Sequence, residues 1–326
     1  MVLKPIRVIQ IGFGSLGIEI FKILRKNKKF KIIGVVDSDK TKIGKDCGIL
    51  TKKTKSGHRI VRKINEIKSK PDIVIHVTTS KIEQAYSQIS EIAKKRVSVI
   101  STCEELVYPY RKHRKFAEKF DRLAKKYHIV ILGVGINPGF LMDSMVLMLS
   151  GLCNQIDKIS VSRIVNLGKR RRALQNKMCV GKTNSEFKKI RNKVGHVGLE
   201  ESARMIADSL NLKLNFSSTI KPFIAKNTIH SNGIVVKRGR ISGIRQTLVG
   251  KTKNLEFLKM KLFMYVGAKE YDLIDIKGIP PIYLKTKGVN GDQSTIGLLT
   301  NYIPIVLQSK PGLQTVNKLT IPKFFN

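Results

Sequence analysis

The stretch that decides the fold is Ile6–Gly17, with the sequence IRVIQIGFGSLG. Its first half is rich in Ile and Val, as expected of a strand buried inside a parallel sheet. Its second half is a GxGxxG loop, whose glycines allow a tight turn, the close approach of a pyrophosphate and close packing of a helix on the strand. A helical segment, IEIFKIL, follows at residues 18–24. The stretch therefore predicts a strand, a phosphate-binding loop and a helix in that order.

Apolar strand-like runs and helical segments alternate from here to residue 134. We expect further strands at residues 31–36, 71–77, 97–101 and 128–134, and helices at residues 82–95 and 114–127. This alternation predicts an α/β fold, with a doubly wound parallel sheet of the Rossmann type over residues 1–135.

The pattern changes beyond residue 135. Strand-like segments recur at residues 159–165, 216–224, 233–236, 246–249 and 257–266, with a helical segment at 197–210 and a basic, irregular segment at 167–193. We expect an α+β domain over residues 136–326. Its last part, a helix at 294–307 and an irregular tail from residue 311, either completes this domain or packs back on the first.

The charge balance is strongly basic. The chain has 326 residues, with 62 Lys and Arg against 23 Asp and Glu, so the formal net charge is +39. Phosphate neutralisation by such charge drives sequence-independent nucleic-acid binding. The basic residues are spread over most of the chain, however, and no helix-turn-helix, zinc-finger or RNP motif accompanies them. We therefore expect a solvated basic surface and no specific nucleic-acid binding.

Apolar run lengths and cysteine spacing indicate the expected cellular location. No apolar run is long enough for a membrane span, and the N-terminal run leads straight into the glycine loop, unlike a signal peptide. The four cysteines, Cys47, Cys103, Cys153 and Cys179, show neither CxxC pairing nor metal-ligand spacing. We expect a reducing, cytoplasmic location, no membrane partner and no metal.

The first candidate site binds a dinucleotide. The candidate cofactor-binding loop consists of Gly12, Phe13, Gly14, Ser15, Leu16 and Gly17. Asp37 ends the next strand, where a carboxylate accepts a hydrogen bond from a ribose 2′-OH and repels a 2′-phosphate, which favours NAD. Ser38, Lys40 and Lys42 follow and suit a 2′-phosphate if the carboxylate turns away. The cofactor is therefore NAD or NADP, with NAD preferred.

Hydroxyl side chains follow a later strand of the same sheet. Thr78 and Thr79 come directly after residues 71–77. Ligands bind beyond the carboxyl ends of strands in open α/β sheets, so we expect both residues to contact the cofactor. Capping of the next helix explains a threonine there equally well.

The catalytic candidates follow the strand at residues 97–101. A carboxylate at this position can exchange a proton with an amine or imine nitrogen while hydride moves at the adjacent carbon. Because Glu104 and Glu105 are adjacent, we expect one to face the site and the other to cap a helix, and we favour Glu104 as the catalytic group. Cys103 raises the alternative of a thiolate nucleophile. No histidine lies near it in sequence, so a small buried thiol is favoured.

A second glycine-rich element, GVGINPGFLMD, occupies residues 133–143. It is expected to end a strand and open a helix, with Asn137 at the N-cap and Pro138 at the first helical position. The backbone near Asn137 would then close over the nicotinamide. Phe140 and Met142 either line a substrate pocket or belong to the core.

Two features of the second half stay open. The densest basic segment, Lys169–Arg172 with Gln175, Lys177 and Lys182, suits a substrate carboxylate, a cofactor phosphate, nucleic acid or simply solvent. His196 lies at a helix start, where it is either a substrate contact or a structural residue.

Together these segments make the chain resemble the 2,4-diaminopentanoate dehydrogenases and related NAD(P)H-dependent amine dehydrogenases, and more distantly the dihydrodipicolinate reductase group. The matching segments are residues 12–17, 34–39, 101–106, 133–143, 169–181, 195–208 and 303–316. The resemblance spans essentially the whole chain. The paired-His plus Lys motif of true dihydrodipicolinate reductases is absent.

The resemblance implies oxidative deamination of an amine, or the reverse reductive amination of a ketone with ammonia, coupled to NAD(P). It implies Glu104 as the catalytic residue, a pocket-lining segment made of Asn137, Pro138, Gly139 and Phe140, and a homodimer formed through the second domain. Two alternatives remain: a related imine or semialdehyde reductase that releases no ammonia, and a degenerate dehydrogenase that binds polyanions.

Overall fold

The computed structural model describes residues 4–51, 54–191, 194–253 and 255–325. The chain divides into two compact units, one of Met1–Gly139 with Gly291–Asn326 and one of Phe140–Asn290. The division therefore lies slightly beyond the expected boundary at residue 135. The C-terminal segment, which the sequence left either within residues 136–326 or packed back on the first domain, belongs to the first unit.

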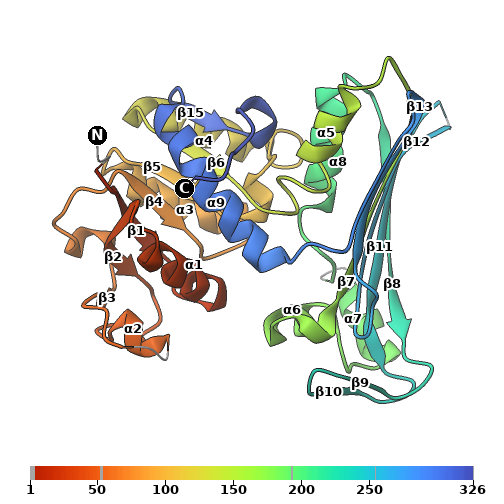
Figure 1. Cartoon of the computed structure of the whole chain (residues 1–326), viewed down its shortest axis with the longest axis horizontal. Coiled ribbons are helices and arrows are strands. Elements are labelled where there is room, and N and C mark those ends of the chain that lie inside the picture. Colours follow the sequence, from red (N-terminus) through yellow and green to blue (C-terminus); the bar gives the residue numbers. More distant parts are fainter. Residues whose placement is uncertain (1–3, 52–53, 192–193, 254, 326) are drawn as a thin grey trace. The chain divides into compact units, whose positions relative to one another are not determined.

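The first unit is built on a seven-stranded parallel sheet with the order β15-β6-β5-β4-β1-β2-β3 (Figure 1). Its strands are β1 (Ile6–Ile11), β2 (Phe30–Val36), β3 (Ile60–Val61), β4 (Ile73–His76), β5 (Ser98–Ser101), β6 (Val130–Gly133) and β15 (Gly312–Gln314). Apart from β15, this is the 3-2-1-4-5-6 order of dinucleotide-binding folds. The predicted Rossmann-type sheet is confirmed. In such sheets the chain reverses its direction of winding between β1 and β4, where ligands bind.

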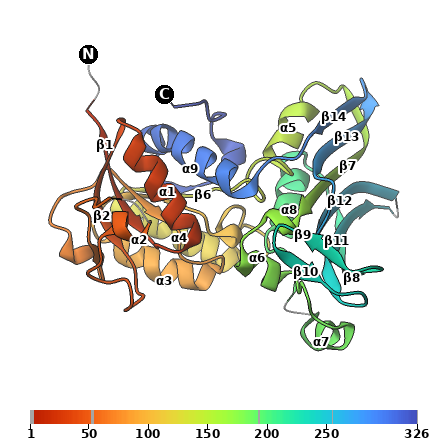
Figure 2. The ribbon, with the colours of Figure 1, turned by 60° about the horizontal axis from the view of Figure 1, so that its bottom comes forward.

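Helices cover both faces of this sheet. They are α1 (Ser15–Lys26), α2 (Cys47–Leu50), α3 (Ile82–Ala93), α4 (Arg114–Tyr127) and α9 (Gly291–Gln308), with short 3-10 turns η1 (Ile64–Glu66), η2 (Glu104–Leu106) and η5 (Val316–Lys318). Helices α1 and α9 lie on one face, and α3 and α4 on the other (Figure 2). The buried residues of α1, Gly17, Ile20, Phe21 and Leu24, recur at helical spacing and so form one apolar stripe.

The C-terminal segment completes the sheet. Helix α9 packs against β5 and β6, and β15 pairs with β6 in parallel. The N–H of Leu313 also donates to Asp121 Oδ1 of α4, at 3.2 Å. The tail expected to be irregular thus contributes an edge strand. Its partners set its conformation, because three residues carry no period of their own.

The second unit is a six-stranded mixed sheet with helices on one face. Its sheet order is β14-β13-β7-β12-β11-β8, antiparallel except for β12 with β7. The strands are β7 (Gln155–Asn166), β8 (Asn215–Ile224), β11 (Ile241–Thr252), β12 (Leu255–Tyr265), β13 (Tyr271–Ile279) and β14 (Ile282–Thr286), with a separate hairpin of β9 (Ile229–Ser231) and β10 (Ile234–Val236). The expected α+β architecture of this part is confirmed.

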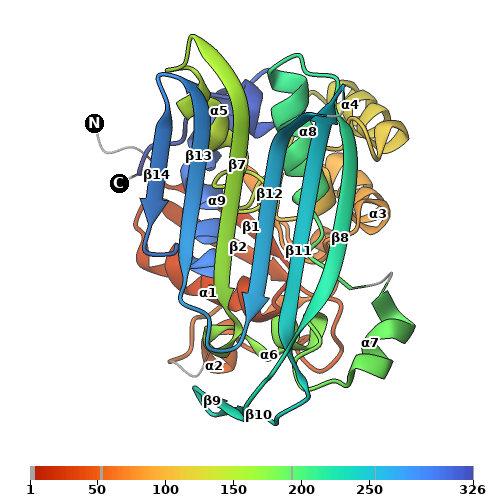
Figure 3. The same cartoon turned by 90° about the vertical axis from the view of Figure 1, so that its right-hand side faces the viewer.

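The helices of this unit are α5 (Ser144–Ser150), α6 (Arg172–Lys177), α7 (Asn184–Ile190) and α8 (Leu199–Ser209), with the turn η3 (Leu167–Lys169). Figure 3 looks onto the sheet from the side opposite α5 and α8, and no helix of this unit lies in front of it. Strand β12 alternates accordingly: Leu258, Met260, Leu262 and Met264 are buried in the core, and the residues between them are half-buried on the open face.

Two expectations about this unit were incomplete. Residues 167–193 contain η3, α6 and α7 rather than only irregular chain, and residues 192–193 lie outside the described residues. Strands β13 and β14 were not predicted. Among the described residues, none of the helices combines the length and apolar character needed to cross a membrane.

Candidate active site

The three glycines of the loop between β1 and α1 are required for different reasons. Gly12 has a φ of +100°, and a Cβ there would lie 2.3 Å from the Val77 carbonyl oxygen. A Cβ on Gly17 would lie 2.2 Å from the Gly12 carbonyl oxygen. A Cβ on Gly14 would meet nothing within 4 Å. The fold itself therefore explains Gly12 and Gly17, whereas the space beside Gly14 is open for a ligand.

That space lies at the N-terminus of α1. Gly14 is the N-cap residue, and no side chain caps the helix there. The adjoining Ser15 is exposed and Leu16 is half-buried. A helix N-terminus presents N–H groups and the positive end of the helix dipole, which together favour a phosphate. The loop therefore fits the pyrophosphate of a dinucleotide.

A buried amide that sequence reasoning missed holds this loop closed. Gln10 lies on β1 with no exposed surface. Its Nε2 donates to the Gly12 carbonyl at 2.9 Å and to the Gly17 carbonyl at 2.8 Å. One side chain thus joins the two ends of the glycine loop. The available signal was an amide two residues before the loop, in a strand that is apolar apart from Arg7.

Asp37 follows β2 and points back at the same loop. Its Oδ2 accepts from the Phe13 N–H at 2.6 Å, and its Oδ1 accepts from the Asp39 N–H at 2.8 Å. Lys42 Nζ lies 3.1 Å from Asp39 Oδ2 and 3.8 Å from Asp37 Oδ2. The Asp37 carboxylate is therefore fixed beside the glycine loop. The Phe13 side chain is part of the core and packs edge-on against Phe21.

Neighbouring positions differ in their access to ligand. Ser38 and Lys40 are exposed. Beyond β4, the exposed Thr78 hydroxyl donates to Gln88 of α3, while the Thr79 hydroxyl donates to Gln84 and accepts from the Lys81 N–H. Both hydroxyls therefore bond to side chains within α3, but neither caps the helix, whose N-cap residue is Lys81.

The two glutamates of η2 have separate environments. Glu105 is buried, with Oε1 2.8 Å from Lys81 Nζ and Oε2 accepting from the Ile82 N–H at 3.0 Å. It therefore caps α3. Burial alone would raise the pKa of Glu105, but these hydrogen bonds outweigh it and hold the pKa below the usual 4.5. Glu104 is half-buried at the first position of η2.

Cys103 does not have the environment of a nucleophile. The residue is fully buried. Burial raises the pKa of its thiol to about 12, so the reactive thiolate is not formed at neutral pH. This favours the small buried thiol over the thiolate alternative.

The element after β6 departs from the predicted helix start. The Asn137–Pro138 bond is cis, Gly139 has a φ of +125°, and residues 137–143 form turns. Helix α5 begins at Ser144 instead, with Asp143 as its cap. The expectation of Asn137 at the N-cap and Pro138 at the first helical position is therefore wrong, because the Gly139 backbone is not helical.

The Asn137 carboxamide is buried and is a candidate ligand contact. It is 7% exposed, and neither Oδ1 nor Nδ2 has a hydrogen-bond partner among the described residues. A buried, unpaired carboxamide is costly unless a ligand or water satisfies it. Pro138 and Gly139 are buried beside it, and the strand ends carrying Asn137 and Glu104 are neighbours, since Val134 N–H donates to the Ser101 carbonyl.

In the second unit, Phe140 is half-buried and Met142 belongs to the hydrophobic core. The backbone N–H of His196 donates to Gln246 Oε1 at 2.9 Å, just before α8.

The densest basic segment is partly neutralised within the same unit. Arg170 lies 2.9 Å and Lys169 3.4 Å from the carboxylate of Glu270. Arg170 is 9% exposed, so it is not a solvated charge. Gln175 donates to the carbonyls of Leu167 and Arg170. At Arg170 and the buried Gln175 the segment is structural, whereas the Lys169 side chain is mostly exposed.

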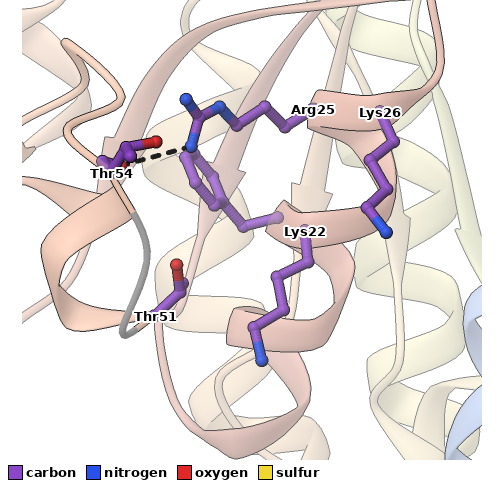
Figure 4. Close-up of a pocket in the computed structure, with 6 residues that line it drawn as sticks. Lys22, Arg25, Lys26, Thr51 and Thr54 are labelled. Atoms are coloured by element: carbon purple, nitrogen blue, oxygen red, sulfur yellow. Dashed lines mark hydrogen bonds between the residues drawn. The ribbon is translucent and has the colours of Figure 1, made fainter.

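A separate cavity of about 260 Å³ lies on the first unit (Figure 4). It lies beside the second half of α1 and is lined by Phe21, Lys22, Arg25, Lys26, Thr51 and Thr54. It contains none of the predicted site residues. Among the described residues, no cluster of three or more His, Cys, Asp or Glu side chains is arranged to hold a metal ion.

Two family models and one curated relative match this chain. A family model described as 2,4-diaminopentanoate dehydrogenase C-terminal domain matches residues 140–326, and one described as dihydrodipicolinate reductase, N-terminus, matches residues 6–106. A 2,4-diaminopentanoate dehydrogenase from Acetoanaerobium sticklandii is 29% identical over 340 residues, which cover 98% of this chain and 95% of that protein.

Two solved structures show the same fold. The amine dehydrogenase from Mycobacterium smegmatis is 22% identical, with a TM-score of 0.87 over 98% of this chain and 97% of that one. A probable dehydrogenase from Thermotoga maritima is 12% identical, with a TM-score of 0.58 over 95% and 91% of the two chains. Since the first family model spans more than half of the sequence, the chain belongs to the 2,4-diaminopentanoate dehydrogenase family.

Proposed function

We propose that the protein is an NAD(P)-dependent amine dehydrogenase that deaminates 2,4-diaminopentanoate or a similar amine, and in reverse aminates a ketone with ammonia. The observation that carries this is the division of roles in η2. Glu105 is committed to α3 through Lys81 and the Ile82 N–H, while Glu104 is held beside it on the same rigid turn. The related enzyme from A. sticklandii supports the substrate class.

Glu104 is the proposed catalytic residue. A bound NAD(P) would supply the hydride acceptor for the carbon that carries the amine. The Glu104 carboxylate orients the amine and takes up its proton, and in the reverse direction it orients ammonia. Asn137 is proposed to contact the cofactor, because its buried carboxamide gains a hydrogen-bond partner there. Pro138, Gly139, Phe140 and His196 are proposed to form part of the substrate site.

NAD is the proposed preferred cofactor. The Asp37 carboxylate is held by two backbone N–H groups, so turning away would cost both hydrogen bonds. Lys42 is engaged by Asp39, which removes one cation that a 2′-phosphate needs. NADP therefore meets a fixed negative charge, and NAD meets a hydrogen-bond acceptor.

A homodimer through the second unit is also proposed. The open face of its sheet carries Phe223, Phe263 and Tyr265, with the Phe223 and Tyr265 rings 4.4 Å apart and the Phe223 and Phe263 rings 5.8 Å apart. Aromatic clusters on exposed faces are typical of protein interfaces. Sedimentation equilibrium would test this, with Phe263→Lys expected to yield monomers.

We propose a cytoplasmic location, which suits the four free cysteines.

The proposed activity is tested by screening amines for NADH formation at alkaline pH. We expect 2,4-diaminopentanoate or a close analogue to reduce NAD, and the corresponding ketone to consume NADH only when ammonia is added. Reduction without an ammonia requirement would instead indicate the imine or semialdehyde reductase. Salt-sensitive nucleic-acid binding without any turnover would indicate the polyanion-binding alternative.

A further inference from the structure

A series of hydrogen-bonded polar groups, buried at His76 and Ser101 and exposed at Gln88, lies at the strand ends that carry the candidate site. Its centre is His76, the last residue of β4, which has no exposed surface. His76 Nδ1 lies 2.8 Å from Ser101 Oγ on β5, and His76 Nε2 lies 2.7 Å from Gln88 Oε1 on α3. Ser101 Oγ in turn accepts from the Cys103 N–H at 3.1 Å.

The available donors and acceptors fix which group donates in each of these hydrogen bonds. Gln88 Oε1 can only accept, and it also receives the Thr78 hydroxyl. His76 Nε2 therefore carries the proton and donates to Gln88, with the Thr78 hydroxyl oxygen as a second acceptor 2.9 Å away. Its Nδ1 is then an acceptor, to which the Ser101 hydroxyl donates. Burial lowers the pKa of His76 from its ordinary value near 6.5, so the ring stays neutral and keeps this tautomer.

At the Ser101 end of this series of hydrogen bonds lies the start of η2. Cys103 is the N-cap residue of that turn, no side chain caps the turn, and the next residue is Glu104. On the other side, Glu105 holds the turn to α3. The turn is therefore held from both flanks, by Glu105 against α3 and by Ser101 through His76. Removing either support frees the backbone that places Glu104.

We propose that His76 is a positioning residue, whose neutral Nε2–H tautomer orients Ser101 and thereby fixes the backbone turn that presents Glu104. This rests on the proposed function for its catalytic consequence. Because His76 is fully buried, its proposed role runs through the Ser101 hydroxyl. Because the link to Ser101 runs through Nδ1 alone, the two ring nitrogens have separable roles.

Two matched substitutions separate those roles. An Asn carboxamide occupies the position of Nδ1 and can accept from Ser101, whereas a Gln carboxamide reaches the position of Nε2 and leaves the Ser101 hydroxyl without its acceptor. The loss of one buried hydrogen bond then lowers kcat by roughly tenfold. We expect His76→Gln and Ser101→Ala to show this loss, and His76→Asn to stay within about threefold of wild type.

Affinity for NADH distinguishes positioning from general damage. We expect His76→Gln to lower kcat while the NADH dissociation constant changes less than about threefold. Ile89→Ala is the control, because Ile89 is a fully buried core residue next to Gln88 on α3. It should lower the unfolding midpoint without changing kcat of the folded enzyme. Equal kcat in His76→Asn and His76→Gln would overturn the proposal.

The tautomer provides a test that needs no turnover. In nitrogen-15 spectra at pH 8 we expect His76 to be neutral with its proton on Nε2, and the Cys103 amide to exchange faster in His76→Gln than in His76→Asn. A proton on Nδ1, or equal exchange in the two variants, would overturn the proposal. If wild-type protein shows this tautomer and exchange but oxidises no amine, the proposed function fails and the positioning of the turn stands.

Discussion

Replacing Gly14 by alanine separates cofactor binding from folding. The Gly14 backbone, with φ of −77° and ψ of −169°, is open to any residue, and a Cβ there meets nothing within 4 Å. Reduced freedom of the unfolded chain stabilises such a substitution by about 0.4–1 kcal/mol. Alanine is a poorer N-cap than glycine by roughly half a kcal/mol. The two effects nearly cancel, so the free energy of unfolding should change by less than about 0.5 kcal/mol.

Cofactor affinity should respond quite differently. The added methyl group occupies the space that a pyrophosphate needs beside the α1 N-terminus. Losing one hydrogen bond to a charged phosphate costs about 1.5–3 kcal/mol. We therefore expect the NADH dissociation constant of Gly14→Ala to rise by roughly 10- to 150-fold. Fluorescence titration of NADH and urea denaturation of the same samples measure the two quantities.

Two other glycines serve as controls. Gly17→Ala places a Cβ 2.2 Å from the Gly12 carbonyl oxygen, so it should lower the free energy of unfolding by about 1–3 kcal/mol. Gly297→Ala lies within α9 with open space around it, and should stabilise the fold by up to about 1 kcal/mol without affecting NADH. The reasoning is refuted if Gly14→Ala binds NADH as tightly as wild type does.

The remaining predictions concern charge. Asp37→Ser should shift the ratio of NAD to NADP turnover toward NADP, because the fixed carboxylate no longer repels the 2′-phosphate; an unchanged ratio would contradict this. Asp272→Ala leaves the Arg163 guanidinium, 4% exposed, buried without its carboxylate, and should cost about 3–5 kcal/mol in urea denaturation. The Arg163→Lys variant, which keeps a cation, should cost less. The pKa of Glu105 is lower in the folded state, so its contribution to stability is present above about pH 4.5 and is lost as pH falls further. Glu105→Gln should therefore flatten the acid side of the stability curve, whereas an equally steep fall would count against the Lys81 contact.

The first unit was largely predictable because its signals are local. The Ile6–Gly17 stretch, Asp37 and the alternating strands depend on sequence neighbours, and β1 and α4 match their predicted bounds. The expectation that one of the two adjacent glutamates caps a helix followed from simple geometry, and Glu105 does cap α3. Which of the two caps α3 depends on the contact between Glu105 and Lys81. These residues are 24 positions apart, so sequence periodicity could not indicate the contact.

The features that were missed depend on long-range pairing of polar groups. Strand β13 contains the buried Asp272, which looks solvent-exposed in sequence but pairs with Arg163 of β7. Gln10 and His76 are also buried polar residues whose partners come from separate elements or from a folded loop. Arg170, for which solvent was the default interpretation, is held by Glu270. Hydrophobic patterning cannot identify such residues, because their burial is stabilised by partners rather than by apolar area.

The central claim is that this site couples hydride transfer to the release of ammonia from an amine, with Glu104 handling the proton. The most direct measurement is the simultaneous assay of NADH and ammonia formed from 2,4-diaminopentanoate by wild type and by Glu104→Gln. The account predicts equal molar amounts from wild type, and a loss of at least roughly 100-fold in turnover in the variant with little change in NADH affinity. Full turnover in Glu104→Gln, or NADH formed without ammonia, would contradict it.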